Sequence, residues 1–145
     1  MNKDTTAKLE EKLIQIEHEE ELEKYLNDSE YIVPYESFTD YYMSLEKVKS
    51  AETSRLVHDS GIERGYCYQI LNGTRKNPSR DKILRLCLAA HLSLKETNRA
   101  LKAANEAVLY SRNRRDAIII FSIEQCHSCQ DTNILLDQFS EKPME

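Results

Sequence analysis

The spacing of apolar residues predicts a chain made of helices. Between positions 37 and 104, apolar side chains recur at intervals of three and four, which places them on one face of each of five successive helices. The first is a single helix that begins after Ser37 and carries the stripe Phe38, Tyr41, Tyr42, Leu45 and Val48. The next four are a short helix over Thr53 to Asp59, a helix over Glu63 to Asn72, a helix that Ser79 caps, and a helix opened by the capping box Ser93-Leu94-Lys95-Glu96.

The two ends of the chain carry further helical patterns. Residues 5–26 are rich in Glu and Lys and predict one amphipathic helix or two short ones. Ala117 to Ile123 has the β-branched composition of a strand, but no partner strand is expected, so a buried helix is favoured; Ser128 caps a last helix that runs through Phe139. We therefore predict an all-α fold with an acidic helical arm over residues 1–34, a domain over 35–106 and a helical extension over 107–145.

Composition agrees with this organisation. The chain has 145 residues, about one domain with a short extension, and holds 3 Gly, 3 Pro and no Trp. The longest apolar run, Ala117 to Phe121, is far shorter than a membrane span, and the first residues lack the apolar core of a signal peptide. The four cysteines suit a reducing compartment. We expect a soluble, cytoplasmic protein with no membrane contact.

Charge is segregated along the chain, although the net charge is only −5. Residues 1–60 hold 7 Lys or Arg against 15 Asp or Glu, residues 61–115 hold 12 against 4, and residues 116–145 hold 1 against 6. An anionic partner responds to the local field within about a Debye length and not to the total charge. The middle block therefore predicts a surface that attracts phosphate, and the bland interpretation is that its cations only solvate helix faces.

The middle block contains a turn between two short helices. Gly61 provides the positive φ that a sharp turn between helices needs, and Asn72-Gly73 provides a helix C-terminal stop. On the helix between them, one side carries Tyr66, Cys67, Ile70 and Leu71, and the other carries Arg64, Gly65, Tyr68, Gln69 and Asn72. The second side presents groups that can hydrogen-bond base edges in a DNA major groove.

These residues resemble the XRE family of helix-turn-helix regulators, the family of phage repressor and Cro. The resemblance is carried, in chain order, by Ser60-Gly61-Ile62, Ile70-Leu71-Asn72-Gly73-Thr74-Arg75 and Asn77-Pro78-Ser79-Arg80-Asp81-Lys82. It implies a five-helix repressor-like domain over residues 35–106 that binds double-stranded DNA, with the helix over Glu63 to Asn72 as its recognition helix. The extension over 107–145 resembles additions found on some bacterial members of the family.

The resemblance also implies the contact residues. The base-contact candidates are Glu63, Arg64, Tyr68 and Gln69, of which Arg64 is suited to guanine and Gln69 to adenine. The phosphate-contact candidates are Thr53, Ser54, Asn72, Thr74, Arg75, Lys76 and Arg80. This chain departs from the family at Glu52, where Ser or Thr is usual near a phosphate.

Two other motifs have chemical alternatives. Cys126-His127-Ser128-Cys129 has the spacing of a redox or zinc motif, but no second pair of ligands accompanies it, so a structural role is favoured. Arg112, Arg114 and Arg115 precede the isoleucine-rich helix. They are either a second phosphate-contacting patch or cations with acidic partners, because cations alone are unfavourable at a helix N-terminus. The carboxylates of residues 1–30 are the natural candidate for such partners. We expect no enzyme activity, no metal and no cofactor.

The sequence leaves three functions open. The first is a DNA-binding transcriptional regulator that uses the helix-turn-helix, with the N-terminal arm or the C-terminal helices pairing two copies or holding a protein partner. The second is an interaction adaptor on the same scaffold that does not primarily read DNA. The third is a thiol sensor that uses Cys126 and Cys129.

Overall fold

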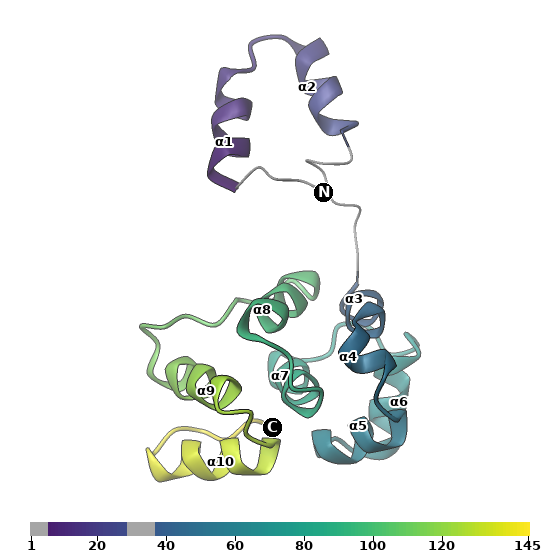
Figure 1. Cartoon of the computed structure of the whole chain (residues 1–145), viewed down its shortest axis with the longest axis vertical. Helices are drawn as coiled ribbons and strands as arrows, with labels where there is room; N and C mark the ends of the chain where they lie inside the picture. The colour runs from purple at the N-terminus through teal and green to yellow at the C-terminus, as the bar shows by residue number, and fades with distance from the viewer. Residues whose placement is uncertain (1–5, 29–36) are drawn as a thin grey trace. The chain divides into compact units, whose positions relative to one another are not determined.

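The computed structural model describes residues 6–28 and 37–145, and within these ranges every regular element is a helix (Figure 1). The chain divides into two compact units, residues 1–35 and 36–145. In the first unit, α1 (Thr6–Gln15) and α2 (Glu19–Leu26) are the two short helices that were one of the two predicted outcomes. The break before α2 is at His18, whose backbone is extended, with φ −121° and ψ 143°.

The second unit holds eight helices in its described part. They are α3 (Phe38–Ser44), α4 (Glu46–Lys49), α5 (Thr53–Ser60), α6 (Arg64–Leu71), α7 (Arg80–Ala89), α8 (Leu94–Ala103), α9 (Arg114–Glu124) and α10 (Cys129–Gln138). Helix α7 lies between the α5–α6 pair and the α9–α10 pair (Figure 1). It is the centre of the core, since Ile83, Leu84 and Leu86 on it are 0% exposed.

The capping residues act as the sequence predicts. The hydroxyl oxygens of Ser37, Ser79, Ser93 and Ser128 each accept a hydrogen bond from a backbone amide in the first turn of the helix that follows. Ser93 and Glu96 form the full capping box. Ala117 to Ile123 lies within α9, so the strand alternative is wrong for this segment.

The prediction of one helix from Ser37 through Val48 is wrong. The chain leaves the helical region at Leu45, whose ψ is 137°, and this residue separates α3 from the single turn of α4. Residues 37–104 therefore form six helices instead of five. Tyr42 and Val48 remain buried on either side of the break, and the Tyr42 hydroxyl donates to the Leu86 carbonyl over 2.8 Å. The apolar spacing continues across the break because α3 and α4 both bury their apolar side chains in the core.

Helices α9 and α10 repeat α7 and α8 with an offset of 35 residues, a relation that the sequence analysis missed. We name residues 80–110 the first hairpin and residues 115–145 the second hairpin. Eight of the 31 aligned pairs are identical: Arg80/Arg115, Asp81/Asp116, Ile83/Ile118, Ser93/Ser128, Thr97/Thr132, Asn98/Asn133, Leu101/Leu136 and Glu106/Glu141. Two backbone irregularities also coincide, because φ is 52° at His91 and 55° at Cys126, and 57° at Asn105 and 60° at Ser140.

The contacts inside each hairpin are duplicated as well. Arg80 Nε donates to the Ala107 carbonyl over 3.0 Å, and Arg115 Nε donates to the Lys142 carbonyl over 2.7 Å. The Leu109 amide donates to Asn98 Oδ1 over 2.9 Å, and the amide of its counterpart, Met144, donates to Asn133 Oδ1 over 2.8 Å. In both hairpins, an arginine and an asparagine thus tie the segment after the second helix back onto the pair.

Between the hairpins, the contacts are reciprocal. Arg80 pairs with Asp116 through two bonds of 3.0 Å, and Arg115 pairs with Asp81 through bonds of 3.1 and 3.2 Å. Each aspartate also accepts a hydrogen bond from the last backbone amide of the other hairpin: Asp116 from Tyr110 N, and Asp81 from Glu145 N. A contact of i with j that is matched by a contact of j with i is the mark of an approximate two-fold axis.

The ion pair also affects the titration of Asp81. Burial raises the pKa of Asp81, but the bonds from Arg115 and the Glu145 amide outweigh it and hold that pKa below its ordinary value.

These pairs correct one expectation. Arg114 and Arg115 have acidic partners within the second unit, Glu141 at 3.0 Å from Arg114 and Asp81 at 3.1 Å from Arg115, where the sequence predicts residues 1–30 as the candidate. Duplication explains the difference, because Arg115 stands where Arg80 stands in the first hairpin and so meets the aspartate of the opposite hairpin.

Candidate nucleic-acid interface

The turn between α5 and α6 has the geometry that its glycine predicts. Gly61 ends α5 with φ 68° and ψ 8°, in the left-handed region that favours glycine. A Cβ at Gly61 would lie 2.8 Å from Arg85 Nη1, which donates to the Ser60 carbonyl over 3.0 Å. The turn is therefore both left-handed and held closely against α7, so that α6 has a fixed direction relative to the core.

Helix α6 has one buried side and one exposed side. Cys67, Ile70 and Leu71 are at most 6% exposed. Arg64 and Gln69 are exposed, and Tyr68 is half-buried. This division agrees with the prediction, except that Tyr66, expected to be buried, is half-buried under cations, with Arg75 Cζ 4.1 Å and Lys82 Nζ 5.2 Å from its ring centroid.

The exposed side of α6 and the loop after it bring most of the predicted contact residues together. We name the α6 surface the set Arg64, Tyr68, Gln69, Asn72, Thr74, Arg75 and Lys76. Arg75 Nε donates to Gln69 Oε1 over 3.2 Å, and Arg64 Cζ lies 5.6 Å from the Tyr68 ring centroid. The Arg75 guanidinium thus lies beside the Gln69 carboxamide, and the Arg64 guanidinium lies beside the Tyr68 ring. The ring contacts limit the motion of these side chains.

The loop that completes the α6 surface is fixed by its own backbone. The Arg75 amide donates to the Gln69 carbonyl over 2.9 Å, and the Thr74 amide donates to Asn72 Oδ1 over 2.8 Å. Gly73 has φ 82° and lies in open space, so its conformation rather than crowding requires glycine. The side chains of Thr74, Arg75 and Lys76 are exposed from a loop of defined shape.

Glu63 has a local role that the sequence analysis missed. Its carboxylate accepts the Gly65 amide over 2.9 Å and the Tyr66 amide over 2.7 Å, and therefore caps α6. These backbone bonds hold the pKa of Glu63 below its ordinary value. A Cβ at Gly65 would lie 3.3 Å from Glu63 Oε1, so glycine leaves room for the cap. The predicted base-contact residue at this position therefore binds its own helix, and it places a negative charge at the start of the α6 surface.

The guanidinium of Arg80, another phosphate-contact candidate, is occupied by contacts within and between the two hairpins. Its guanidinium bonds to Asp116 and to the carbonyls of Ala107 and Val108, and we therefore remove it from the candidate set. Thr53 and Ser54 are exposed at the start of α5, where Glu52 makes no side-chain cap. No side chain caps this first turn, so Thr53 and Ser54 remain phosphate-contact candidates, with Glu52 as the unfavourable neighbour.

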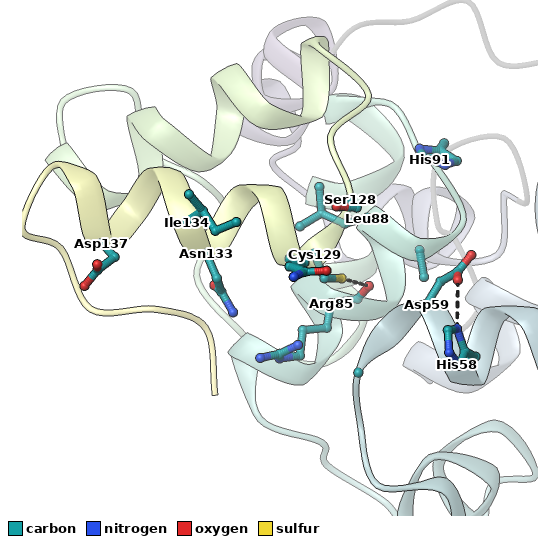
Figure 2. A pocket seen from close by; sticks show the side chains of 13 residues that line it. His58, Asp59, Arg85, Leu88, His91, Ser128, Cys129, Asn133, Ile134 and Asp137 are labelled. Atoms are coloured by element: carbon teal, nitrogen blue, oxygen red, sulfur yellow. Dashed lines mark hydrogen bonds and ion pairs between the residues drawn. The ribbon is translucent and has the colours of Figure 1, made fainter.

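A cavity of about 670 Å³ lies between α5, α7 and α10 (Figure 2). Cys129 lines it and donates from Sγ to the Arg85 carbonyl over 3.1 Å, and burial raises the pKa of its thiol to about 11. A thiol with a raised pKa is a poor nucleophile, which favours the structural role for Cys129, while Cys126 is exposed. Within the described ranges, no three His, Cys, Asp or Glu side chains are grouped so as to hold a metal ion.

Comparison of this chain with protein-family models, with curated proteins and with solved structures gave no match. Among the helices of the described residues, none combines the length and the apolar character needed to cross a membrane.

Proposed function

We propose that this protein binds double-stranded DNA through the α6 surface, as a helix-turn-helix transcriptional regulator. The observation that carries the proposal is the arrangement of Arg64 and Gln69 on the exposed side of a short helix that follows a glycine turn, with Arg75 of the next loop bonded to Gln69. Helix α6 enters the major groove, where Arg64 reads guanine and Gln69 reads adenine, and the loop after α6 follows the phosphate backbone.

Charge supports this orientation. The first hairpin and α6 belong to the basic block of residues 61–115, which holds 12 Lys or Arg against 4 Asp or Glu. Arg80, Arg85 and Arg115 of this block are committed to carboxylates or carbonyls, whereas the loop cations Arg75 and Lys76 are exposed beside α6. Phosphate contacts therefore come from the loop, and base contacts come from the helix.

The proposal is tested by selecting bound sites from random duplexes and measuring three variants on the selected site. Gln69→Ala and Arg64→Ala each relax the preference at one base pair, with a cost of about 1–3 kcal/mol on the selected site. Arg75→Ala weakens the selected site and unrelated duplexes by the same factor. Lys95→Ala, an exposed lysine on α8, is the matched control and leaves binding unchanged. Equal losses on all sequences for all three variants would contradict base reading.

The second candidate is a protein-interaction adaptor, and Glu63 and Glu52 favour it. Glu63 places a carboxylate at the first turn of α6, where it caps the helix. Glu52 places another at the start of α5, where it makes no cap. Both helix N-termini near the proposed DNA backbone therefore carry a negative side chain, which repels phosphate. If the chain does not bind duplex DNA, or binds it with an affinity that does not change with salt concentration, the adaptor is the function that remains.

A further inference from the structure

The outer surface of the second hairpin carries apolar residues that remain exposed. We name Ile118, Phe121, Leu135 and Phe139 the second-hairpin face. Phe121 is 52% exposed and Phe139 is 45% exposed, while Ile118 and Leu135 are half-buried. Their counterparts in the first hairpin are Ile83, Leu86, Ala100 and Ala104, of which the first three are 0% exposed and the last is half-buried. The face is thus less buried in the second hairpin than in the first, and the difference is largest between Leu86, at 0% exposed, and Phe121, at 52%.

The first hairpin is covered there by α3 and α4. Phe38 and Tyr42, four residues apart on α3, stack with ring centroids 5.3 Å apart, and the Tyr42 hydroxyl donates to the Leu86 carbonyl. Lys47 on α4 then reaches Glu96 of α8 at 2.8 Å. The cover therefore consists of a helix with two aromatic side chains four residues apart and a lysine five residues beyond the second.

The second hairpin keeps the acidic half of that contact. Asp131 stands at the position of Glu96; its carboxylate is exposed and has no ion-pair partner within the described residues. Residues 115–145 hold two Lys or Arg against six Asp or Glu, whereas residues 80–110 hold six against three. An acidic, partly apolar face attracts a basic amphipathic helix.

We propose that the second-hairpin face binds a helix of a partner protein that places two aromatic side chains four residues apart against Phe121 and Leu135, and a Lys or Arg against Asp131. The duplicated hairpin and the unpaired carboxylate carry this inference, which goes beyond DNA binding and does not depend on it. Helices α1 and α2 of this chain do not fit by charge, because residues 6–28 hold three Lys against eight Asp or Glu.

The probe is a peptide with the sequence of residues 37–50, labelled with fluorescein and held helical by a lactam between Asp40 and the lysine of a Ser44→Lys change, two positions that are exposed in α3. Fluorescence anisotropy of this peptide is measured against the full chain. Saturable binding is expected, and Phe121→Ser weakens it about tenfold or more because the apolar centre of the face is lost. Ile134→Ser is the matched control, since Ile134 is 58% exposed on α10 but borders the cavity of Figure 2, and it leaves binding unchanged.

A charge exchange tests the Asp131 contact. Asp131→Lys weakens the peptide about threefold, and a Lys47→Glu peptide recovers that loss against the same variant. Circular dichroism confirms that each variant remains folded. Equal binding by the Phe121→Ser and Ile134→Ser variants, or no recovery by the exchanged peptide, overturns the proposal. The proposal is also overturned if the peptide does not bind and the chain self-associates in sedimentation experiments. If Phe121→Ser abolishes that self-association, the face binds a second copy of the chain.

Discussion

The first and second hairpins are built from the same parts and meet different surroundings. Both begin with Arg-Asp, both cap their second helix with Ser, and both return the chain through an asparagine side chain. The first supports α3–α6 on its outer surface and buries Leu86 completely, while the second leaves Phe121 about half exposed. Local sequence therefore determines the hairpin, and what covers it determines which positions become core.

The charges of the two hairpins diverge in the same way. The first belongs to the same basic block of residues 61–115 as the proposed DNA-contact surface, whereas the second is acidic. Because the basic hairpin attracts phosphate and the acidic one repels it, we propose nucleic-acid contact on the side of the first hairpin and protein contact on the side of the second. Variants at matched positions of the two hairpins measure this division.

The largest difference is expected at Leu86 and Phe121, which occupy the same position of the two hairpins. Leu86→Ala lowers the free energy of unfolding by about 3 kcal/mol, since a fully buried leucine leaves a cavity. Phe121→Ala changes it by under about 1 kcal/mol, because this ring is already half in water. Urea unfolding followed by circular dichroism measures both. Equal losses would show that the second-hairpin face is core and is covered in solution.

The reciprocal ion pairs should differ less. Asp116 is 9% exposed in its pair with Arg80, and Asp81 is 19% exposed in its pair with Arg115. Asp116→Asn leaves the Arg80 guanidinium half-buried without its anion and lowers the free energy of unfolding by about 3 kcal/mol. Asp81→Asn lowers it by about 1–2 kcal/mol, since water screens the more exposed pair. The same urea experiment ranks them, and the reverse order would contradict the account of the two-fold interface.

The Asp81 pair also predicts a dependence on pH. The pKa of Asp81 is held below its ordinary value of about 3.9 by Arg115 and the Glu145 amide, so the native state favours the charged carboxylate. Its contribution to stability is present above pH 4 and is lost as pH falls through the lowered pKa. The difference in urea midpoint between the native chain and Asp81→Asn should therefore shrink from pH 7 to pH 3. Asp137→Asn, at an exposed position, is the control that shows no such change.

The smallest effect is expected at Glu63. Glu63→Ser keeps a side chain that caps α6 and removes the negative charge, so the urea midpoint stays the same while affinity for duplex DNA rises about two- to fivefold at low salt. Glu124→Ser removes a carboxylate from the second hairpin instead, and it leaves affinity unchanged. A decrease in affinity for Glu63→Ser would assign the carboxylate to a base, as the resemblance implies.

Much of the helical pattern could be predicted from sequence, because caps and glycines act locally. Ser79, Ser93 and Gly61 have the expected conformations. The break at Leu45 was missed because apolar spacing continues across it. The duplication is hard to detect from sequence because only eight positions are identical. The difference in burial between Leu86 and Phe121 cannot be predicted locally, because Leu86 is covered by α3, which is distant in sequence.

For the candidate site, sequence could predict which residue types lie on α6 but not what each side chain binds. The bond from Arg75 Nε to Gln69 Oε1, for example, joins a base-contact candidate to a phosphate-contact candidate. Arg80 was placed with them because its neighbours in sequence are in the loop, but its partner Asp116 lies 36 positions away. The pattern predicts a base contact at Glu63, because it does not reveal that the carboxylate accepts hydrogen bonds from two backbone amides of its own helix.

The measurement that tests the central claim most directly is the salt dependence of DNA binding. The logarithm of the affinity for a duplex is measured against the logarithm of salt concentration for the native chain and for the Arg75→Ala, Lys76→Ala double variant. The account predicts a steep decline for the native chain and a slope smaller by about 2 for the variant, since each lost phosphate contact removes roughly 0.9. The charge-matched Lys95→Ala, Lys102→Ala variant on α8 keeps the native slope. A flat response in the native chain, or equal slopes for the two double variants, would contradict DNA binding through the α6 surface.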